Sequence, residues 1–275
     1  MSISKPIAFG LFFVVTQLVS CDAAANTTTQ PLFPAILIFG DSTADTGNNN
    51  YYPQAVFNHA IPVSQQPSMF KDYISRLKGI VGDKKAMEIV NNALVVISAG
   101  PNDFILNFYD ILTRRLQYPT IYGYQDFVLK RLDGFFRFRL PPMGCLPIQM
   151  TMKMRNIKRC CVEQENKDSV LYNQKLAKKL PEIETSLPGS KFLYANVYDP
   201  VMDMIQNPSI YGFKETKKGC CGTGYMELSF LCNSFSRTCP NHSDHLFWDS
   251  IHPSEAAYTY LGNLIDAQIQ EWLWA

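Results

Sequence analysis

Three short apolar runs, separated by helical patterns, constrain the fold of this chain more than any other feature. The runs cover residues 35–39, 94–98 and 192–197, and each one ends near a polar or turn residue. Apolar runs of this length predict strands. Strands that alternate with helices predict a parallel sheet covered by helices on both faces. The chain is therefore expected to be an α/β protein with a mainly parallel central sheet.

Apolar residues at helical spacing lie between and after these runs. They predict helices over residues 70–81, 86–90, 170–187 and 257–272. Pro181 is expected to disturb the end of the third helix, because proline lacks the backbone N–H that a helix uses. The last helix has a start signal in Pro253, Ser254 and Glu255.

Polar residues follow two of the expected strands directly. Ser42 comes just after the first strand, which ends at Gly40, and Asn102 follows the second. Sites in parallel sheets lie at the carboxyl ends of strands. Ser42 is thus either a nucleophile held at the sheet edge or an ordinary helix cap, and Asn102 is either a site residue or one that shapes its loop.

A serine hydroxyl needs a base before it can attack. Of the four histidines, only His252 has a carboxylate at short spacing in a promising context, because Asp249 precedes it by three residues. Ser42, Asp249 and His252 are therefore candidates for a triad, with Asp249 orienting the imidazole. The Ser42 backbone N–H and the Asn102 amide are candidate donors to an oxyanion. The alternative is a surface turn at Asp249 and His252.

The composition narrows the functional class. The chain has 275 residues, 47% of them hydrophobic, and a net charge of +1 without a long charge run. This balance argues against an electrostatic nucleic-acid binder. No repeat or Gly/Ser linker divides the sequence, so a single domain over residues 26–275 is expected.

The first 25 residues have the layout of a secretory signal peptide. Lys5 precedes an apolar stretch, and small residues follow at positions 23–25. The stretch is too short to be a good membrane span. A buried N-terminal helix and a lipoprotein signal with lipid on Cys21 are the alternatives. Secretion would make Asn26 and Asn241 glycosylation sites, since each begins an Asn-x-Ser/Thr sequon.

Cysteine usage agrees with an oxidising compartment. Seven cysteines remain after residue 25, an odd number, so disulfides are expected with one cysteine left over. Cys220 and Cys221 are neighbours, and a bond between neighbours would strain disulfide geometry, so each is expected to bond elsewhere. A zinc site at Cys239, His242 and His245 is the alternative.

Five stretches together extend over nearly all of the chain after the signal: GDSTADTGN from Gly40, GPND from Gly100, PPMGCLP from Pro141, KGCCG from Lys218 and NHSDHLFWDSIHPSEAAY from Asn241. These stretches resemble the motifs of the plant GDSL esterase/lipases of the SGNH hydrolase superfamily.

The resemblance implies a three-layer α/β/α flavodoxin-like sandwich that cleaves carboxylic esters of lipids or small molecules. In that comparison Ser42 is the nucleophile, His252 the base and Asp249 its partner, with Ser42 and Asn102 as oxyanion donors. No cofactor or metal is implied. The chain is expected to be a secreted monomer of the cell wall or apoplast, and the plant-type secretory signal outweighs the lipoprotein alternative.

The resemblance also sets the cysteine expectations. Cys160 stands where a large apolar residue is common in the family, so it is the expected odd cysteine. Three disulfides are then expected among the remaining cysteines, which are Cys145, Cys161, Cys220, Cys221, Cys232 and Cys239.

Two departures from the family pattern predict internal deletions. The family's glycine block between the first motif and GPND is missing, and with it a third oxyanion donor and a central strand. The stretch RLDGFFRFRL also leads into Pro141 without a clear strand. One or two family strands are thus expected to be absent. An impaired or inactive remnant that binds a ligand is the alternative to an active hydrolase.

Overall fold

The structure is a computed structural model that describes residues 31–44, 63–110, 113–131, 140–153, 158–228 and 231–274. The expected signal peptide and the sequon at Asn26 lie outside these ranges, as do Asp45 and Asn48 of the first motif. The strands are β1 (Ile36–Gly40), β2 (Leu94–Ser98), β3 (Glu215–Gly219) and β4 (His245–Phe247). The helices are α1 (Gln66–Val81), α2 (Asp83–Asn91), α3 (Pro101–Phe104), α4 (Thr113–Gln117), α5 (Ile121–Arg131), α6 (Pro147–Met152), α7 (Glu163–Ser186), α8 (Tyr198–Gln206) and α9 (Glu255–Trp274).

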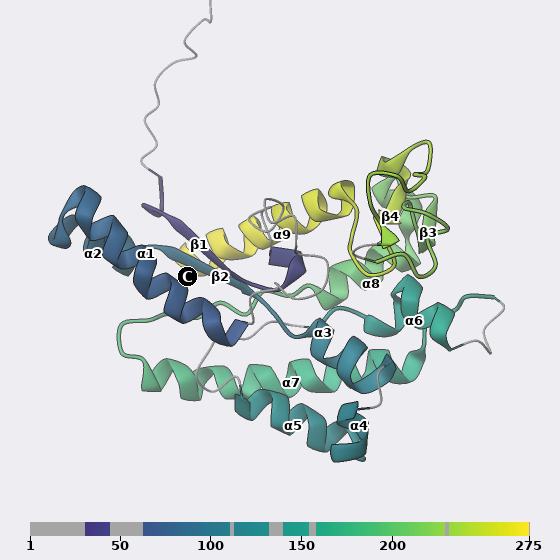
Figure 1. The fold of residues 1–275 in the computed structure, drawn as a ribbon, viewed down its shortest axis with the longest axis horizontal. Helices are drawn as coiled ribbons and strands as arrows, with labels where there is room; N and C mark the ends of the chain where they lie inside the picture. The colour runs from purple at the N-terminus through teal and green to yellow at the C-terminus, as the bar shows by residue number, and fades with distance from the viewer. Residues whose placement is uncertain are drawn as a thin grey trace, which may run out of the picture.

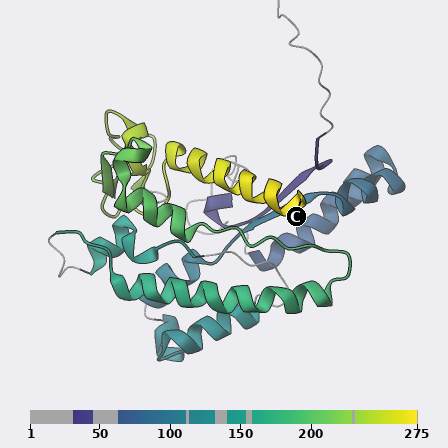
Figure 2. The same cartoon turned by 180° about the vertical axis from the view of Figure 1, so that it is seen from behind.

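Two of the three expected strands form a parallel pair. β1 and β2 pair in register from Ile36 opposite Leu94 to Gly40 opposite Ser98. The helices α1 and α2 connect them and lie on one side of the pair, while α9 lies on the other (Figures 1 and 2). This is the α/β/α layering that was expected, with a sheet of two strands in the described part of the chain.

The helix contacts explain why α1 covers this sheet. Phe39 points from β1 onto Phe70 of α1, with ring centroids 5.4 Å apart, and Phe70 stacks on Tyr73 one turn further on. Gly82 ends α1 and begins α2 with a φ of 82°, a backbone conformation that glycine adopts without steric cost. The chain thus turns sharply between the two helices.

Pro181 was expected to disturb the end of α7. It lies inside the helix, which continues to Ser186. One missing N–H removes a single bond from a ladder of many, and the hydroxyl of Thr185 donates a hydrogen bond to the Pro181 carbonyl oxygen at 2.9 Å.

The third expected strand, residues 192–197, was wrong. This segment carries no strand assignment and leads directly into α8. A strand forms only when another backbone pairs with it. Here the Asn196 backbone N–H instead donates to the side-chain oxygen of Gln268 in α9, at 3.0 Å. The family has a strand before Pro141 that could pair with such a segment. Residues 132–139 of this chain lie outside the described ranges.

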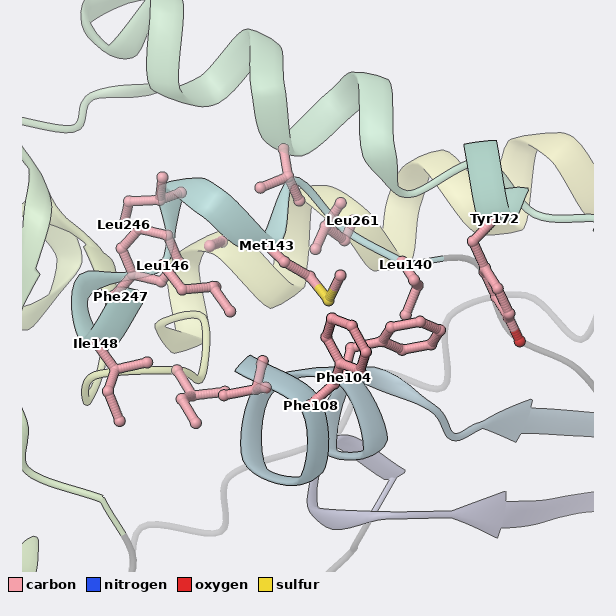
Figure 3. Packing of buried hydrophobic residues seen from close by; sticks show 14 of the residues in the cluster. Phe104, Phe108, Leu140, Met143, Leu146, Ile148, Tyr172, Leu246, Phe247 and Leu261 are labelled. Atoms are coloured by element: carbon pink, nitrogen blue, oxygen red, sulfur yellow. The ribbon is translucent and has the colours of Figure 1, made fainter. Parts of the chain in front are cut away.

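The main core lies beside the sheet and not on it. Its buried cluster is built from α3, α5, α6, α7, α8, β4, α9 and residues of the connecting segments, such as Phe108 and Met143. Figure 3 shows ten of its residues labelled. Residues of β1 and β2 are not members of this cluster. In β1, Ile36 is 61% exposed and Ile38 46% exposed. The two-stranded sheet therefore buries less apolar surface than a central sheet normally does.

The six expected cysteines form three disulfides. Cys145 bonds Cys161, Cys220 bonds Cys239, and Cys221 bonds Cys232. The exposed Cys160 takes part in none of these bonds. Because the Cys239 sulfur is bonded to Cys220, the alternative zinc site at Cys239, His242 and His245 is wrong.

Candidate active site

Ser42 lies on a one-turn 3₁₀ helix that begins where β1 ends. The chain leaves the strand through Gly40, whose φ is 146° and whose Cβ, if it had one, would lie 1.9 Å from the carbonyl oxygen of Ser98. Only glycine fits there. The Asp41 side chain then accepts hydrogen bonds from the Thr43 backbone N–H at 3.1 Å and the Thr43 hydroxyl at 2.7 Å. This turn presents the Ser42 hydroxyl at the sheet edge.

Asp249 and His252 meet in a tight turn before α9. One Asp249 oxygen accepts the backbone N–H groups of Ile251 and His252, at 2.8 and 2.7 Å, and the other lies 2.7 Å from His252 Nδ1. Ser254 then caps α9, because its hydroxyl oxygen accepts the Ala257 backbone N–H at 3.2 Å. The carboxylate thus fixes both the backbone and the ring of His252.

Ser42 and His252 lie in contact although 210 residues separate them. The Ser42 hydroxyl oxygen is 2.7 Å from His252 Nε2. A carboxylate only accepts hydrogen bonds, so Nδ1 of a neutral His252 carries the proton toward Asp249 and Nε2 is left to accept the serine proton. The structure therefore brings together the three residues of the predicted triad.

The surroundings of His252 tune its basicity. Burial alone would lower the pKa of the imidazole, but the hydrogen bond to Asp249 and the negative charges of Asp249 and Asp41 outweigh burial, so the pKa is raised above 6.5. Asp249 itself is buried, with 4% of its surface exposed. A raised pKa strengthens His252 as a base toward a hydroxyl.

A cavity of about 650 Å³ opens beside Ser42 and His252. Its other lining residues are His242, Trp248, Pro253, Ser254, Glu255 and Tyr258. Trp248, Pro253 and Tyr258 give it apolar walls, which suit a hydrocarbon group. Burial, with Asp249 and Asp41 nearby, raises the pKa of Tyr258, so its hydroxyl stays protonated and can donate a hydrogen bond.

Asn102 follows β2 as Ser42 follows β1. It lies in the first turn of α3, and Gly100 precedes that helix with a φ of 132°. Since Gly40 and Ser98 are paired, both residues come from the same edge of the sheet. Asn102 is not among the described residues that line the cavity. Its role as an oxyanion donor stays a prediction.

The remaining predicted site residue within the described ranges is Asn241. It is exposed, and its side-chain oxygen accepts the Ser243 backbone N–H at 3.2 Å. Its glycosylation stays a prediction. Within the described ranges, the helices are too short or too polar to cross a membrane.

Comparison with known proteins gives the family. The profile of the GDSL-like Lipase/Acylhydrolase family matches residues 36–265. The chain belongs to this GDSL family. It is 65% identical to GDSL esterase/lipase At2g30220 and 62% identical to GDSL esterase/lipase At2g30310, both of Arabidopsis thaliana, with 99% of each chain covered in both cases. A third Arabidopsis relative, GDSL esterase/lipase At2g24560, is 55% identical over 99% of this chain and 98% of its own.

The same comparison confirms the internal deletions. The alignment with At2g30220 runs over 358 positions, whereas this chain has 275 residues, a difference of 83. At least 83 positions of that GDSL relative therefore have no counterpart in this chain. The strand missing at residues 192–197 and the exposed face of β1 agree with a GDSL sheet that has lost neighbours.

Sequence reasoning missed several residues around the site. The cavity walls Trp248 and Tyr258 flank the predicted triad closely in sequence, so their proximity to His252 was a usable signal. Gln66 was also missed. Its side chain hydrogen-bonds the backbone of Gly40 across 26 residues, and no local pattern predicts such a contact.

Proposed function

We propose that this chain hydrolyses carboxylic esters through an acyl-enzyme formed on Ser42. The observation that carries the proposal is the continuous chain of short contacts from Ser42 to His252 and from His252 to Asp249, each 2.7 Å long. Membership of the GDSL family supports the same reaction class.

The first half of the reaction acylates Ser42. His252 Nε2 takes the hydroxyl proton as the serine oxygen attacks the carbonyl carbon of the ester. The negative charge that develops on the carbonyl oxygen is met by the Ser42 backbone N–H and the Asn102 amide. The imidazolium then gives its proton to the departing alcohol, and the acyl group remains on Ser42.

The second half releases the acid. Water takes the place of the alcohol, gives a proton to His252 and attacks the acyl carbon. The imidazolium returns that proton to the Ser42 oxygen as the carboxylic acid leaves. Asp249 keeps its charge throughout, because its task is to orient the ring and stabilise the imidazolium.

The apolar walls favour lipid or small acyl esters as substrates. Trp248, Pro253 and Tyr258 face the cavity next to Ser42 and can enclose an acyl chain or an aryl alcohol. A secreted chain, free of the first 25 residues and acting outside the cell, agrees with the three disulfides. N-terminal sequencing of the exported protein should begin near residue 26, and recovery of Met1 would contradict export by cleavage.

The decisive experiment uses a short-chain aryl ester and a serine-directed phosphonate. The wild-type chain should release the aryl alcohol, and the phosphonate should label Ser42 alone. Ser42→Ala and His252→Ala should each abolish hydrolysis while the far-ultraviolet circular dichroism spectrum is retained. Ser254→Ala is a poor control because it removes a helix cap, whereas Ser209→Ala, on an exposed 3₁₀ turn distant in sequence, is a suitable one.

An impaired chain that binds ligands without turnover is the second candidate. It is favoured by the loss of at least 83 positions relative to At2g30220 and by the exposure of Ile36 and Ile38. Loss of one oxyanion donor lowers turnover by about 10² to 10³. A folded wild-type chain that neither hydrolyses the ester nor accepts the phosphonate would decide for this alternative.

A further inference from the structure

The two edges of β1 have different partners. The Asp41 backbone N–H donates to the Ser98 carbonyl oxygen at 2.8 Å, and the Leu94 N–H donates to the Ala35 carbonyl oxygen at 3.0 Å. Backbone groups of successive residues in a strand point to opposite edges. The N–H and C=O of Gly40 therefore point away from β2, toward the edge where a further strand of a larger sheet would pair.

At that outer edge the side chain of Gln66 takes the place of a strand. The Gly40 N–H donates to Gln66 Oε1 at 2.9 Å, and Gln66 Nε2 donates to the Gly40 carbonyl oxygen at 2.6 Å. One amide thus satisfies both backbone groups of Gly40. The two contacts also fix the orientation of the amide, because the N–H requires an acceptor and the carbonyl a donor.

This contact lies two residues before Ser42, at the point where the chain leaves the strand. On the β2 side the turn is held by the Asp41 N–H and by the Thr43 hydroxyl, which lies 2.5 Å from the Ser98 hydroxyl. On the outer side it is held by Gln66. Hydrogen bonds on both edges of β1 therefore hold the Ser42 turn. Together they set where the Ser42 oxygen lies relative to His252.

We propose that Gln66 is a positioning residue for the nucleophile, whose amide replaces a neighbouring β-strand at Gly40 and holds Ser42 within reach of His252. This inference rests on the proposed ester hydrolysis at Ser42. It assigns Gln66 no contact with substrate. Its effect is on the geometry of attack, where a misplacement of about 1 Å costs on the order of 10²-fold in rate.

Two substitutions separate the two hydrogen bonds. Gln66→Leu keeps the approximate size of the side chain and removes both bonds. Gln66→Glu keeps an acceptor for the Gly40 N–H but, when ionised, sets a carboxylate oxygen against the Gly40 carbonyl oxygen. When protonated, the introduced carboxyl group has one donor and one acceptor, as the amide does.

The neighbouring residue provides matched controls. Gln65 is exposed, and its side chain makes no capping hydrogen bond to α1. Gln65→Leu and Gln65→Glu therefore repeat the same chemical changes one residue away without touching Gly40. Turnover, KM and phosphonate labelling of all four variants should be measured on the full chain beside the wild type.

The expected result is a fall in kcat of about 10²-fold for Gln66→Leu, with KM changed less than about twofold and slower labelling of Ser42. The Gln65 variants should match the wild type. For Gln66→Glu, the ratio of its kcat to that of the wild type should rise as the pH falls and the introduced carboxyl group is protonated. A purely structural role predicts a ratio that does not change with pH.

A measurement that does not depend on catalysis completes the test. The Gly40 amide should exchange hydrogen slowly in the wild type and in Gln65→Leu, and faster in Gln66→Leu. Full kcat in Gln66→Leu, or unchanged exchange at Gly40, would overturn the role of Gln66 while leaving ester hydrolysis in place. A folded wild type without hydrolysis or labelling would overturn the proposed function, and this inference with it.

Discussion

The backbone N–H of Cys221 donates a hydrogen bond to the carbonyl oxygen of Trp248, at 2.8 Å, one residue before Asp249, which contacts His252. Cys220 makes the same kind of bond to Phe247, at 3.1 Å. Gly219, just upstream, packs so closely that an added Cβ would lie 2.5 Å from the Asp249 carbonyl oxygen. The disulfide-linked loops after β3 therefore support the turn that carries Asp249 and His252.

Removing the Cys221–Cys232 disulfide should weaken that support. The double variant Cys221→Ser, Cys232→Ser is expected to lose about 2 to 5 kcal/mol of stability and to hydrolyse an ester more slowly than the wild type. Denaturant unfolding and ester turnover measure the two effects. Cys160→Ser is the control, because Cys160 is outside the three disulfides, and it should change neither quantity. Equal stability of the double variant and the control would contradict this account.

The pH dependence of hydrolysis should report His252. Because its pKa is raised above 6.5, kcat/KM should increase with pH through a midpoint above 6.5, where the imidazole loses its proton and becomes a base. Asp249→Asn removes the charge that helps to raise this pKa, so the midpoint should move to lower pH. Turnover should also fall by about 10⁴-fold, because the ring loses its orienting carboxylate. A midpoint that stays in place in the variant would exclude Asp249 as the cause.

Asn102 should matter for turnover more than for binding. Asn102→Ala is expected to lower kcat by about 10²-fold or more, as removal of an oxyanion donor does. Asn107→Ala is a matched control. Asn107 lies in the helical segment Ile105–Asp110 that follows α3, and its side-chain nitrogen donates to a carboxylate oxygen of Asp103 at 3.4 Å. Steady-state kinetics with the aryl ester separate kcat from KM. Similar kinetics for the two variants would remove Asn102 from the oxyanion site.

Glu165 should make the folded chain less stable as the pH rises toward 7. Burial raises its pKa to about 7, although Lys153, whose nitrogen is 3.6 Å away, acts to lower it. The folded chain thus keeps the proton up to about pH 7, while the unfolded chain loses it near the ordinary value of 4.5. Between these values the folded state binds more protons, so stability falls as the pH rises.

Replacing Glu165 with glutamine should remove that dependence. The difference in free energy of unfolding between Glu165→Gln and the wild type should favour the variant more at pH 8 than at pH 5, by up to about 3 kcal/mol. Glu163→Gln, in the same first turn of α7, is the control for the chemical change itself. Denaturant unfolding at both pH values provides the measurement. A pH-independent effect of Glu165→Gln would mean that Glu165 is ionised in the folded chain.

Much of the site was predictable because its residues follow local patterns. Ser42 and Asn102 follow apolar runs that do form paired strands, and their common edge follows from parallel pairing. The three-residue spacing of Asp249 and His252 predicted their contact, which the turn at Ile251 produces. In these cases the contacts are set by residues close together in the chain or by the ends of strands.

The incorrect predictions involve partners that are distant in sequence. Residues 192–197 have the composition of a strand, but a strand depends on a neighbour that composition does not supply, and Gln268 takes up the Asn196 N–H instead. Gln66 lies before the expected helix over residues 70–81, and no local pattern pointed to it. Its contact with Gly40 follows from the way α1 is folded back onto β1, which becomes visible only in three dimensions.

The separation of 210 residues between Ser42 and His252 has a consequence for how the chain is made. Synthesis proceeds from the N-terminus at about 5 to 20 residues per second, so Ser42 precedes His252 by roughly 10 to 40 seconds. During that interval the growing chain carries a serine whose hydroxyl has no base beside it. Under the proposed function, a nascent or truncated chain that lacks the segment from Asp249 to His252 therefore carries no activated nucleophile toward the esters of the cell that makes it.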